Sequence, residues 1–278
     1  MDRLKLARSI VAQLQEAMRA PAVPFSLEKG EPGLRESKVG GIPYLPADLP
    51  WPLDSRGAAL YLLMQIDCAQ LKALPDFPHT GLLQWFVSGD DVYGMDFDDI
   101  CSGRGHRVLY HETIDPTVTA ESVQKKMPET PAEDYTPLGK TPCRIVFGNP
   151  EIQPLPGLDA HLGPAFVEKW NQACPEKPIP SIWALCQEFD ADDFIRGETK
   201  EKSVYHQIGG FPYFTQADPR EMNAYPQLDT LLLQLDSDMK DGEDLVLWGD
   251  CGIGNLFISR EDLKKRDFSR VGYNWDCC

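Results

Sequence analysis

The sequence predicts an α+β fold in which two homologous, mainly antiparallel β units pack as an internal pseudo-dimer, with helices at the periphery. Three observations lead to this prediction. A motif rich in glycine and proline occurs twice, and a similar apolar run follows it each time at a constant offset. The apolar runs are short and end at glycine or proline, which is typical of strands. The start of the chain has the apolar spacing of an amphipathic helix.

The first predicted element is this N-terminal helix, over residues 1–20. Apolar residues recur at helical spacing from Leu4 to Met18, with charged residues mostly on the opposite face. The helix is expected to end before Pro21, because proline cannot continue it. Its basic residues also fit a helix that lies on a membrane surface, but an ordinary amphipathic helix docked on a core explains the same pattern.

The first β unit is assigned to residues 38–99. A proline-rich stretch at its start predicts an irregular, extended path, because proline lacks an amide donor and has a fixed φ angle. Strands are expected at Leu60–Ile66 and Leu82–Val87, between glycine and proline breakers. A third strand is expected just beyond the unit, at Arg107–Tyr110.

The middle of the chain, residues 100–206, differs in composition from both ends. Half of the prolines, 12 of 24, lie between residues 116 and 180, and sustained periodicity is weak there. We interpret this stretch as an insertion that wraps around the core rather than as a core layer. The elements expected within it are a strand at Cys143–Phe147 and helices at Ala165–Ala173 and Ile182–Phe189.

The second β unit is assigned to residues 207–278. A capping signature at Ser259 predicts a short helix after it. The elements expected in this unit are strands at Leu245–Trp248, Asn255–Ile258 and Arg270–Trp275 and a helix through Leu263–Arg266.

The two units are related by a repeated sequence. Lys38–Tyr44 matches Gln207–Tyr213, an offset of 169 residues, and at the same offset Leu62–Asp67 matches Leu231–Asp236. Further matches follow after a slip of two residues. Agreement at one offset across separate segments is improbable by chance, so we interpret the units as homologous. Repeats this far apart do not form a solenoid, and a pseudo-two-fold interface within a single compact domain over residues 1–278 is expected instead.

Amide side chains recur within the repeat. Gln65 matches Gln234, and Gln84 falls at the position of Asn255. A buried amide needs hydrogen-bond partners, and the neighbouring Gly-Gly-x-Pro loop offers unpaired backbone groups. The amides therefore either hold this loop or line a pair of polar clefts at the junction of the units.

Several segments of the chain also carry a resemblance to a known family: Gly40–Pro46, Leu63–Asp67, Gly81–Phe86, Gly209–Pro212, Trp248–Asp250 and Tyr273–Cys277. They resemble the YwqG-like family of bacterial proteins, and the resemblance covers nearly the whole chain from about residue 30 onward. It implies a bacterial, cytoplasmic α+β protein. It implies no catalytic or binding residues, because the family is a domain of unknown function.

Composition excludes several classes of function. The chain has 278 residues, and its 43 acidic against 27 basic residues give a formal net charge of −16. Such an excess repels phosphate backbones and anionic lipids, so neither nucleic acid nor membrane is expected as a partner. With 42% hydrophobic residues the chain is not expected to be disordered as a whole.

The sequence also indicates a cellular compartment. Charges interrupt the N-terminal segment where a secretory signal needs an apolar stretch, and the longest apolar run, Ala58–Met64, is far too short for a membrane span. The eight cysteines are scattered along the chain, and Cys277 and Cys278 are adjacent. We therefore expect a cytoplasmic protein with reduced thiols; at Cys277 and Cys278 a vicinal disulfide or a soft-metal site is the alternative to two free thiols.

Motifs that predict a specific chemistry are missing. Leu138–Thr141 lacks the first glycine of a phosphate loop, and Gly249–Gly254 has the glycine order of a connection between strands rather than of a dinucleotide site. Asp96–Asp99 lacks the glycine and glutamate of a calcium loop and is interpreted as a solvated acidic turn. Histidine and cysteine spacing supports no metal site and no nucleophile. No metal and no cofactor are predicted.

The preferred functional prediction is a non-catalytic module that binds a protein partner or a small molecule. Aromatic residues beside the repeated motifs could line a groove between the units, and an acidic aromatic groove favours a cationic or neutral partner. The alternative is an enzyme with a carboxylate site at the junction of the units, built from Asp67, Asp96, Asp236 or Asp250. The predicted binding residues are Tyr44, Trp51, Gln65, Trp85, Tyr213, Gln234, Trp248, Asp250 and Asn255.

Overall fold

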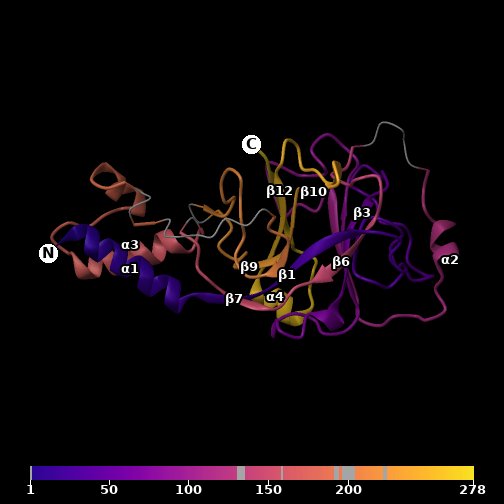
Figure 1. The fold of residues 1–278 in the computed structure, drawn as a ribbon, viewed down its shortest axis with the longest axis horizontal. Coiled ribbons are helices and arrows are strands. Elements are labelled where there is room, and N and C mark those ends of the chain that lie inside the picture. The colour runs from indigo at the N-terminus through magenta and orange to yellow at the C-terminus, as the bar shows by residue number, and fades with distance from the viewer. Residues whose placement is uncertain (1, 130–134, 158, 191–193, 196–203, 222–223) are drawn as a thin grey trace.

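A computed structural model describes residues 2–129, 135–157, 159–190, 194–195, 204–221 and 224–278. Two helices lie at one end of the molecule and a large β-sheet body forms the other (Figure 1). The elements are α1 (Arg3–Ala17), β1 (Arg19–Lys29), β2 (Lys38–Val39), β3 (Tyr61–Asp67), η1 (Cys68–Gln70), β4 (Leu82–Val87), β5 (His106–His111), α2 (Ala120–Gln124), β6 (Cys143–Phe147), β7 (Glu151–Pro154), α3 (Leu162–Ala173), η2 (Ile182–Gln187), β8 (Gln207–Gly209), β9 (Thr230–Asp236), β10 (Asp238–Lys240), β11 (Glu243–Val246), β12 (Ile253–Ile258), α4 (Arg260–Lys265) and β13 (Gly272–Asp276).

One mainly antiparallel sheet dominates the fold. In the described part of the chain its strands run in the order β13-β12-β9-β8-β1-β6-β2-β3-β4-β5, and β7 pairs with β1. The two ends of this order meet. The Tyr273 amide donates to the Ile100 carbonyl at 2.9 Å, and His106 Nε2 donates to the Val271 carbonyl at 3.1 Å. The sheet therefore curls until it is nearly a barrel, with the main apolar core on its inner side.

Aromatic rings fill the centre of this core. Trp85, Trp248 and Tyr273 are fully buried. The Trp85 and Trp248 rings stack at 5.9 Å, and Tyr273 meets Trp85 edge-on at 5.5 Å. Because each ring buries a large apolar area, this cluster joins strands from opposite ends of the chain.

The central strand β1 was not expected from the sequence. The helix predicted over residues 1–20 ends at Ala17, and the chain continues directly into β1, which contains Pro21 and Pro24. Proline normally breaks a central strand. Here β1 changes partners along its length, from β7 to β8 to β6. Both proline carbonyls still accept backbone hydrogen bonds, Pro21 from Gly210 at 2.9 Å and Pro24 from Gly148 at 2.8 Å.

The proline-rich middle of the chain contributes to the sheet. The strands predicted at Leu82–Val87 and Cys143–Phe147 are confirmed with those bounds, as β4 and β6. β6 lies in the middle of the sheet, between β1 and β2, and Cys143 is fully buried in the main core. The interpretation of residues 100–206 as an outer wrapping is therefore wrong for β6. The sequence pattern predicts a strand there, but it does not show which strands β6 pairs with.

The other predicted elements are present with shifted bounds. β3, β5, β12 and β13 lie at the expected strands, and β11 lies two residues before the expected Leu245–Trp248. The glycine-rich connection between β11 and β12 is confirmed. So is the capped helix α4, where Ser259 Oγ accepts from the Asp262 amide at 3.0 Å. The stretch expected to be a helix at Ile182–Phe189 forms the 3-10 helix η2.

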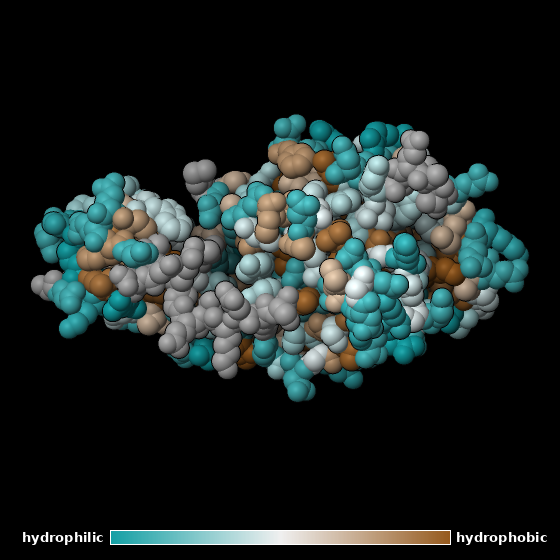
Figure 2. Space-filling model, turned by 45° about the horizontal axis from the view of Figure 1, so that its top comes forward, coloured by the Kyte–Doolittle hydropathy of each residue, from teal (hydrophilic) through white to brown (hydrophobic). Residues whose placement is uncertain are grey.

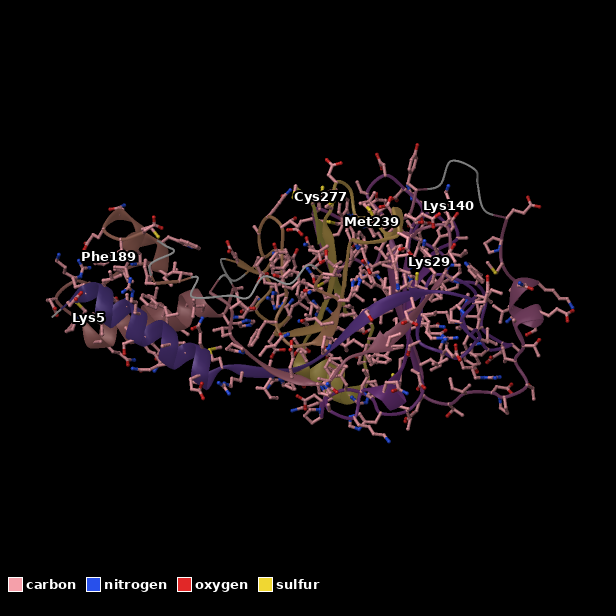
Figure 3. The ribbon with its side chains drawn as sticks, in the orientation of Figure 1. Lys5, Lys29, Lys140, Phe189, Met239 and Cys277 are labelled. Carbon is pink, nitrogen blue, oxygen red and sulfur yellow. The ribbon has the colours of Figure 1, made fainter. Side chains whose placement is uncertain are left out.

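The helices α1 and α3 form a separate apolar cluster. Buried residues of α1, including Val11 and Leu14, pack with Phe166 and Trp170 of α3 and with η2. The N-terminal helix is thus docked on α3 rather than on the sheet core, and Figure 3 shows Lys5 and Phe189 in this lobe. Within the described residues, none of the helices combines the length and the apolar composition needed to cross a bilayer. On the face shown in Figure 2 the surface is largely hydrophilic with scattered apolar side chains.

The contact of His106 across the closing sheet predicts a pH dependence of stability. Burial lowers the pKa of His106 from 6.5 to about 4. The unfolded chain therefore binds more protons than the folded chain between these values, so the free energy of unfolding falls as the pH drops from 6.5 to 4. The loss is up to about 3 kcal/mol. Urea unfolding of wild type and His106→Gln across this range measures it. The glutamine variant keeps a donor for Val271 and loses the titration, so an equal pH slope in both proteins would contradict the prediction.

Candidate functional site

The first Gly-Gly-x-Pro-Tyr loop is held by two buried amides. The Tyr44 amide donates to Gln65 Oε1 at 2.9 Å, and Gln84 Nε2 donates to the Tyr44 carbonyl at 2.7 Å. Gln65 on β3 and Gln84 on β4 are register partners and are fully buried. The two amides thus bind both peptide groups of one tyrosine.

The second loop is held in the same way. The Tyr213 amide donates to Gln234 Oε1 at 2.8 Å, and Asn255 Nδ2 donates to the Tyr213 carbonyl at 3.0 Å. Gln234 on β9 and Asn255 on β12 are again register partners and fully buried. The prediction that the loop backbone supplies the partners of these amides is confirmed in both places. We call each arrangement an amide clamp: Gln65, Gln84 and Tyr44 in the first, Gln234, Asn255 and Tyr213 in the second.

The paired glycines are needed to bring each loop onto its clamp. Gly40 and Gly41 have φ angles of 69° and 75°, and Gly209 and Gly210 have 67° and 73°. Two consecutive positive φ angles disfavour any residue with a Cβ atom. The repeated Gly-Gly is therefore a backbone requirement and not a ligand signal.

The two clamped tyrosines have different surroundings. Tyr44 is fully buried, beside Val118 and Val123 of the segment that contains α2. Its hydroxyl accepts a hydrogen bond from the Asp115 amide at 2.8 Å. Tyr213 is 43% exposed, and its ring stacks on that of Tyr205 at 4.3 Å and 5° between planes.

Two carboxyl groups lie near the stacked tyrosines. Asp236 Oδ2 accepts from the Tyr205 amide at 2.8 Å, and Asp276 Oδ2 accepts from the Gln216 amide at 2.7 Å. Burial raises the pKa of each carboxyl. Burial also raises the pKa of Tyr213, and the charges of Tyr205, Asp236 and Asp276 raise it further. We define the Tyr213 site as Tyr205, Tyr213, Asp236 and Asp276 above the second clamp.

This arrangement suits a positively charged group. The face of an aromatic ring attracts a cation through its quadrupole, and nearby carboxylates add Coulombic attraction. The sequence as a whole, at −16, has the same sign of charge as the site. Within the described residues, no group of three or more histidine, cysteine or acidic side chains is arranged to hold a metal ion.

A comparison with known protein families shows to which family the chain belongs. A family model described as a domain of unknown function, DUF1963, matches residues 37–277. The chain belongs to this family. The match spans both clamps and the Tyr213 site and leaves out α1 and β1. No curated protein matches the chain.

In this DUF1963 domain the predicted binding residues fall into separate places. Tyr213, Gln234 and Asn255 come together in the Tyr213 site and its clamp, whereas Tyr44 and Gln65 lie in the first clamp. The fully buried Trp85 and Trp248 belong to the core. The indole of Trp51 is half-buried and donates to the Leu60 carbonyl at 2.9 Å. Asp250 is exposed in the turn before β12. No groove gathers all nine.

Sequence reasoning did not name Tyr205 or Asp276 as site residues, and it placed Asp236 only in the enzymatic alternative. Tyr205 stands where the first half has Glu36, so it lies just outside the matching motif. The sequence signal for Tyr205 is a difference between the two halves at a position next to the repeated motif.

Two clefts of the DUF1963 domain lie elsewhere. One, of about 440 Å³, lies between residues 136–141 and the β10–β11 hairpin, and the other, of about 380 Å³, lies beside α4. Lys29 and Lys140, labelled in Figure 3, line the first cleft, where Lys29 pairs with Glu243. Both clefts are lined by acidic and basic side chains, so neither favours a ligand of one charge.

Removing the side-chain amide of Gln234 from the second clamp is expected to lower the stability of the protein. Gln234→Leu removes the acceptor of the Tyr213 amide and the donor to the Tyr205 carbonyl. Each buried backbone group left without a partner costs about 1–3 kcal/mol. Urea unfolding measures the loss, and hydrogen exchange at the Tyr213 amide should become faster. Gln172→Leu on the exposed face of α3 is the control, with an expected change within about 0.5 kcal/mol. A Gln234→Leu protein as stable as this control would contradict the structural role of the clamp.

Proposed function

We propose that this protein is a non-catalytic binding module whose Tyr213 site takes the positively charged group of a protein partner or small molecule. The observation that carries the proposal is an exposed tyrosine stacked on a second tyrosine and flanked by two carboxyl groups. An exposed aromatic side chain that is rigidly held is typical of a contact residue, because little side-chain freedom is lost on binding. Nucleic acid and membrane remain outside the proposal on grounds of charge.

The contrast between the two clamps supports this assignment. In the first half, the tyrosine at the same position is buried by the chain's own residues. In the second half, Tyr213 keeps the same backbone contacts and faces solvent. A clamp that only stabilised the fold would work equally well with a small residue at Tyr213, so the exposed ring is proposed to serve binding.

We also propose that the chain falls in the YwqG-like group of bacterial cytoplasmic proteins, and that residues 38–99 and 207–278 are homologous units in an internal pseudo-dimer. The first proposal rests on the motifs quoted above. Three features support the second: the two clamps have the same donors and acceptors, their amides pair in the same register, and the strand order runs outward alike from β6 and β1.

A second candidate function is an enzyme with a carboxylate site. The observation that favours it is the raised pKa of one aspartate. Among the four candidate aspartates, burial raises the pKa of Asp236, as general acid catalysis requires. The Asp236 amide also donates to His206 Nδ1 at 3.0 Å, so a titratable ring lies beside it. Loss of a measured turnover in Asp236→Asn, with stability unchanged, would favour this candidate over the binding module.

The binding proposal predicts affinity for a cation at Tyr213. The probe is n-butyltrimethylammonium chloride, titrated at pH 7 and followed by isothermal calorimetry and by NMR shifts of the tyrosine rings. Tyr213→Ala is expected to weaken binding at least fivefold, since a cation–aromatic contact contributes about 1 kcal/mol. The control Tyr135→Ala removes a tyrosine that is more exposed but lies outside the site, and should leave affinity unchanged. The same affinity in Tyr213→Ala and wild type would refute the site, as would a wild-type protein that binds neither this cation nor n-butylammonium.

A further inference from the structure

At the Tyr213 site and its clamp, two buried side-chain oxygen atoms lack a hydrogen-bond partner within the described residues: Asn255 Oδ1 and Asp276 Oδ1. Thr215 Oγ1 is buried next to them, and its hydroxyl hydrogen-bonds to the Asp276 carboxyl and keeps lone pairs that can accept. Asn255 is fully buried, and its nitrogen is already committed to the Tyr213 carbonyl. Its oxygen is therefore an acceptor with no donor. Burying such a group without a partner is unfavourable, so these oxygens need an explanation.

The first clamp shows what is missing. There, His111 Nε2 lies 2.9 Å from Gln84 Oε1. Gln84 Nε2 donates to the Tyr44 carbonyl and to Gln65, so Oε1 is the acceptor and the His111 ring supplies the hydrogen. The first clamp is thus completed by a donor from the neighbouring strand, β5.

The same position in the second half holds an acceptor. Gln84 pairs with Leu109 on β5, and Asn255 pairs with Asn274 on β13. His111 and Asp276 each stand two residues further along their strand, so both side chains project from the same face as the register partner. Where the first half has a ring N–H, the second half has a carboxylate oxygen.

We propose that the cation bound at the Tyr213 site is a primary ammonium group, which donates hydrogen bonds to Asn255 Oδ1, Asp276 Oδ1 and Thr215 Oγ1. This inference rests on the proposed function and specifies its ligand. An ammonium group has three N–H donors and no acceptor, which matches three acceptor oxygens. Its charge balances the half-buried Asp276 carboxylate, which has no counter-ion among the described residues, and the Tyr213 ring lies close enough for that carboxylate to raise the pKa of its hydroxyl.

The test compares two probes of equal charge and equal alkyl chain. n-Butylammonium has three N–H donors, whereas n-butyltrimethylammonium has none. Calorimetric titration of the full chain at pH 7 is expected to give at least fivefold tighter binding of n-butylammonium. If n-butyltrimethylammonium binds as tightly or more tightly, the inference is overturned while the cation site stands. If neither probe binds, the proposed function itself fails.

Two variants test which side chains accept the hydrogen bonds of the ammonium group. Asp276→Asn and Thr215→Val are expected to reduce the preference for n-butylammonium at least threefold, because each removes one acceptor or its charge. Asp48→Asn, which removes an exposed carboxylate in the other half, should leave the preference unchanged. An unchanged preference in both site variants would overturn the inference.

A titration with a third probe distinguishes a protein partner from a free amine as the source of the ammonium group. An acetylated and amidated pentapeptide with one lysine carries the same group on a protein backbone. Tighter binding of this peptide than of n-butylammonium supports a lysine side chain of a protein partner. Equal binding supports a free amine. If the peptide and n-butylammonium both bind more weakly than n-butyltrimethylammonium, the proposal is contradicted for either source of the ammonium group.

Discussion

The fold depends on how the peptide groups of its irregular loops are satisfied. A Gly-Gly-x-Pro-Tyr loop that crosses the sheet face has no strand partner, and buried peptide groups without partners are strongly unfavourable. The side chains of Gln65 and Gln234 provide the acceptors, and Gln84 and Asn255 provide the donors. Because these amides lie on adjacent strands in register, the sheet must form correctly for the loops to be satisfied. The clamps thus couple strand pairing to loop conformation.

The side chains of Lys38 and Gln207 also satisfy backbone carbonyls of these loops. Lys38 is buried, and its Nζ donates to three loop carbonyls, including that of Ile42 at 2.9 Å. Burial lowers its pKa to about 8. At the matching position of the second half, Gln207 Nε2 donates to the Phe211 carbonyl at 2.7 Å. A charged and a neutral donor therefore meet the same backbone demand, which shows that the demand comes from the loop and not from a particular side chain.

Sequence patterns predicted the parts of the fold that local chemistry determines. β4 and β6 were predicted with their bounds, because breakers surround short apolar runs. β1 was missed because its prolines argue against a central strand, and only the change of partner along the strand makes them tolerable. The repeat found Tyr213, Gln234 and Asn255, because it aligns positions with equal roles. It could not find Tyr205 or Asp276, where the halves differ, and it could not tell the core ring Trp85 from a surface ring, because both follow the same strand pattern.

Differences between the halves therefore say more about function than their similarities. Every feature that both halves share, from the paired glycines to the amide clamp, has a backbone explanation. The features that only the second half has are an exposed ring at Tyr213, a stacking partner in Tyr205 and a carboxylate at the position of His111. In the first half His111 closes the hydrogen-bond network and the segment around α2 covers Tyr44. In the second half, the Asn255 oxygen has no hydrogen-bond donor within the described residues, and the Tyr213 ring beside it is exposed. The second half thus has the same amide clamp as the first but lacks its closing donor, and this difference is what the proposed binding site depends on.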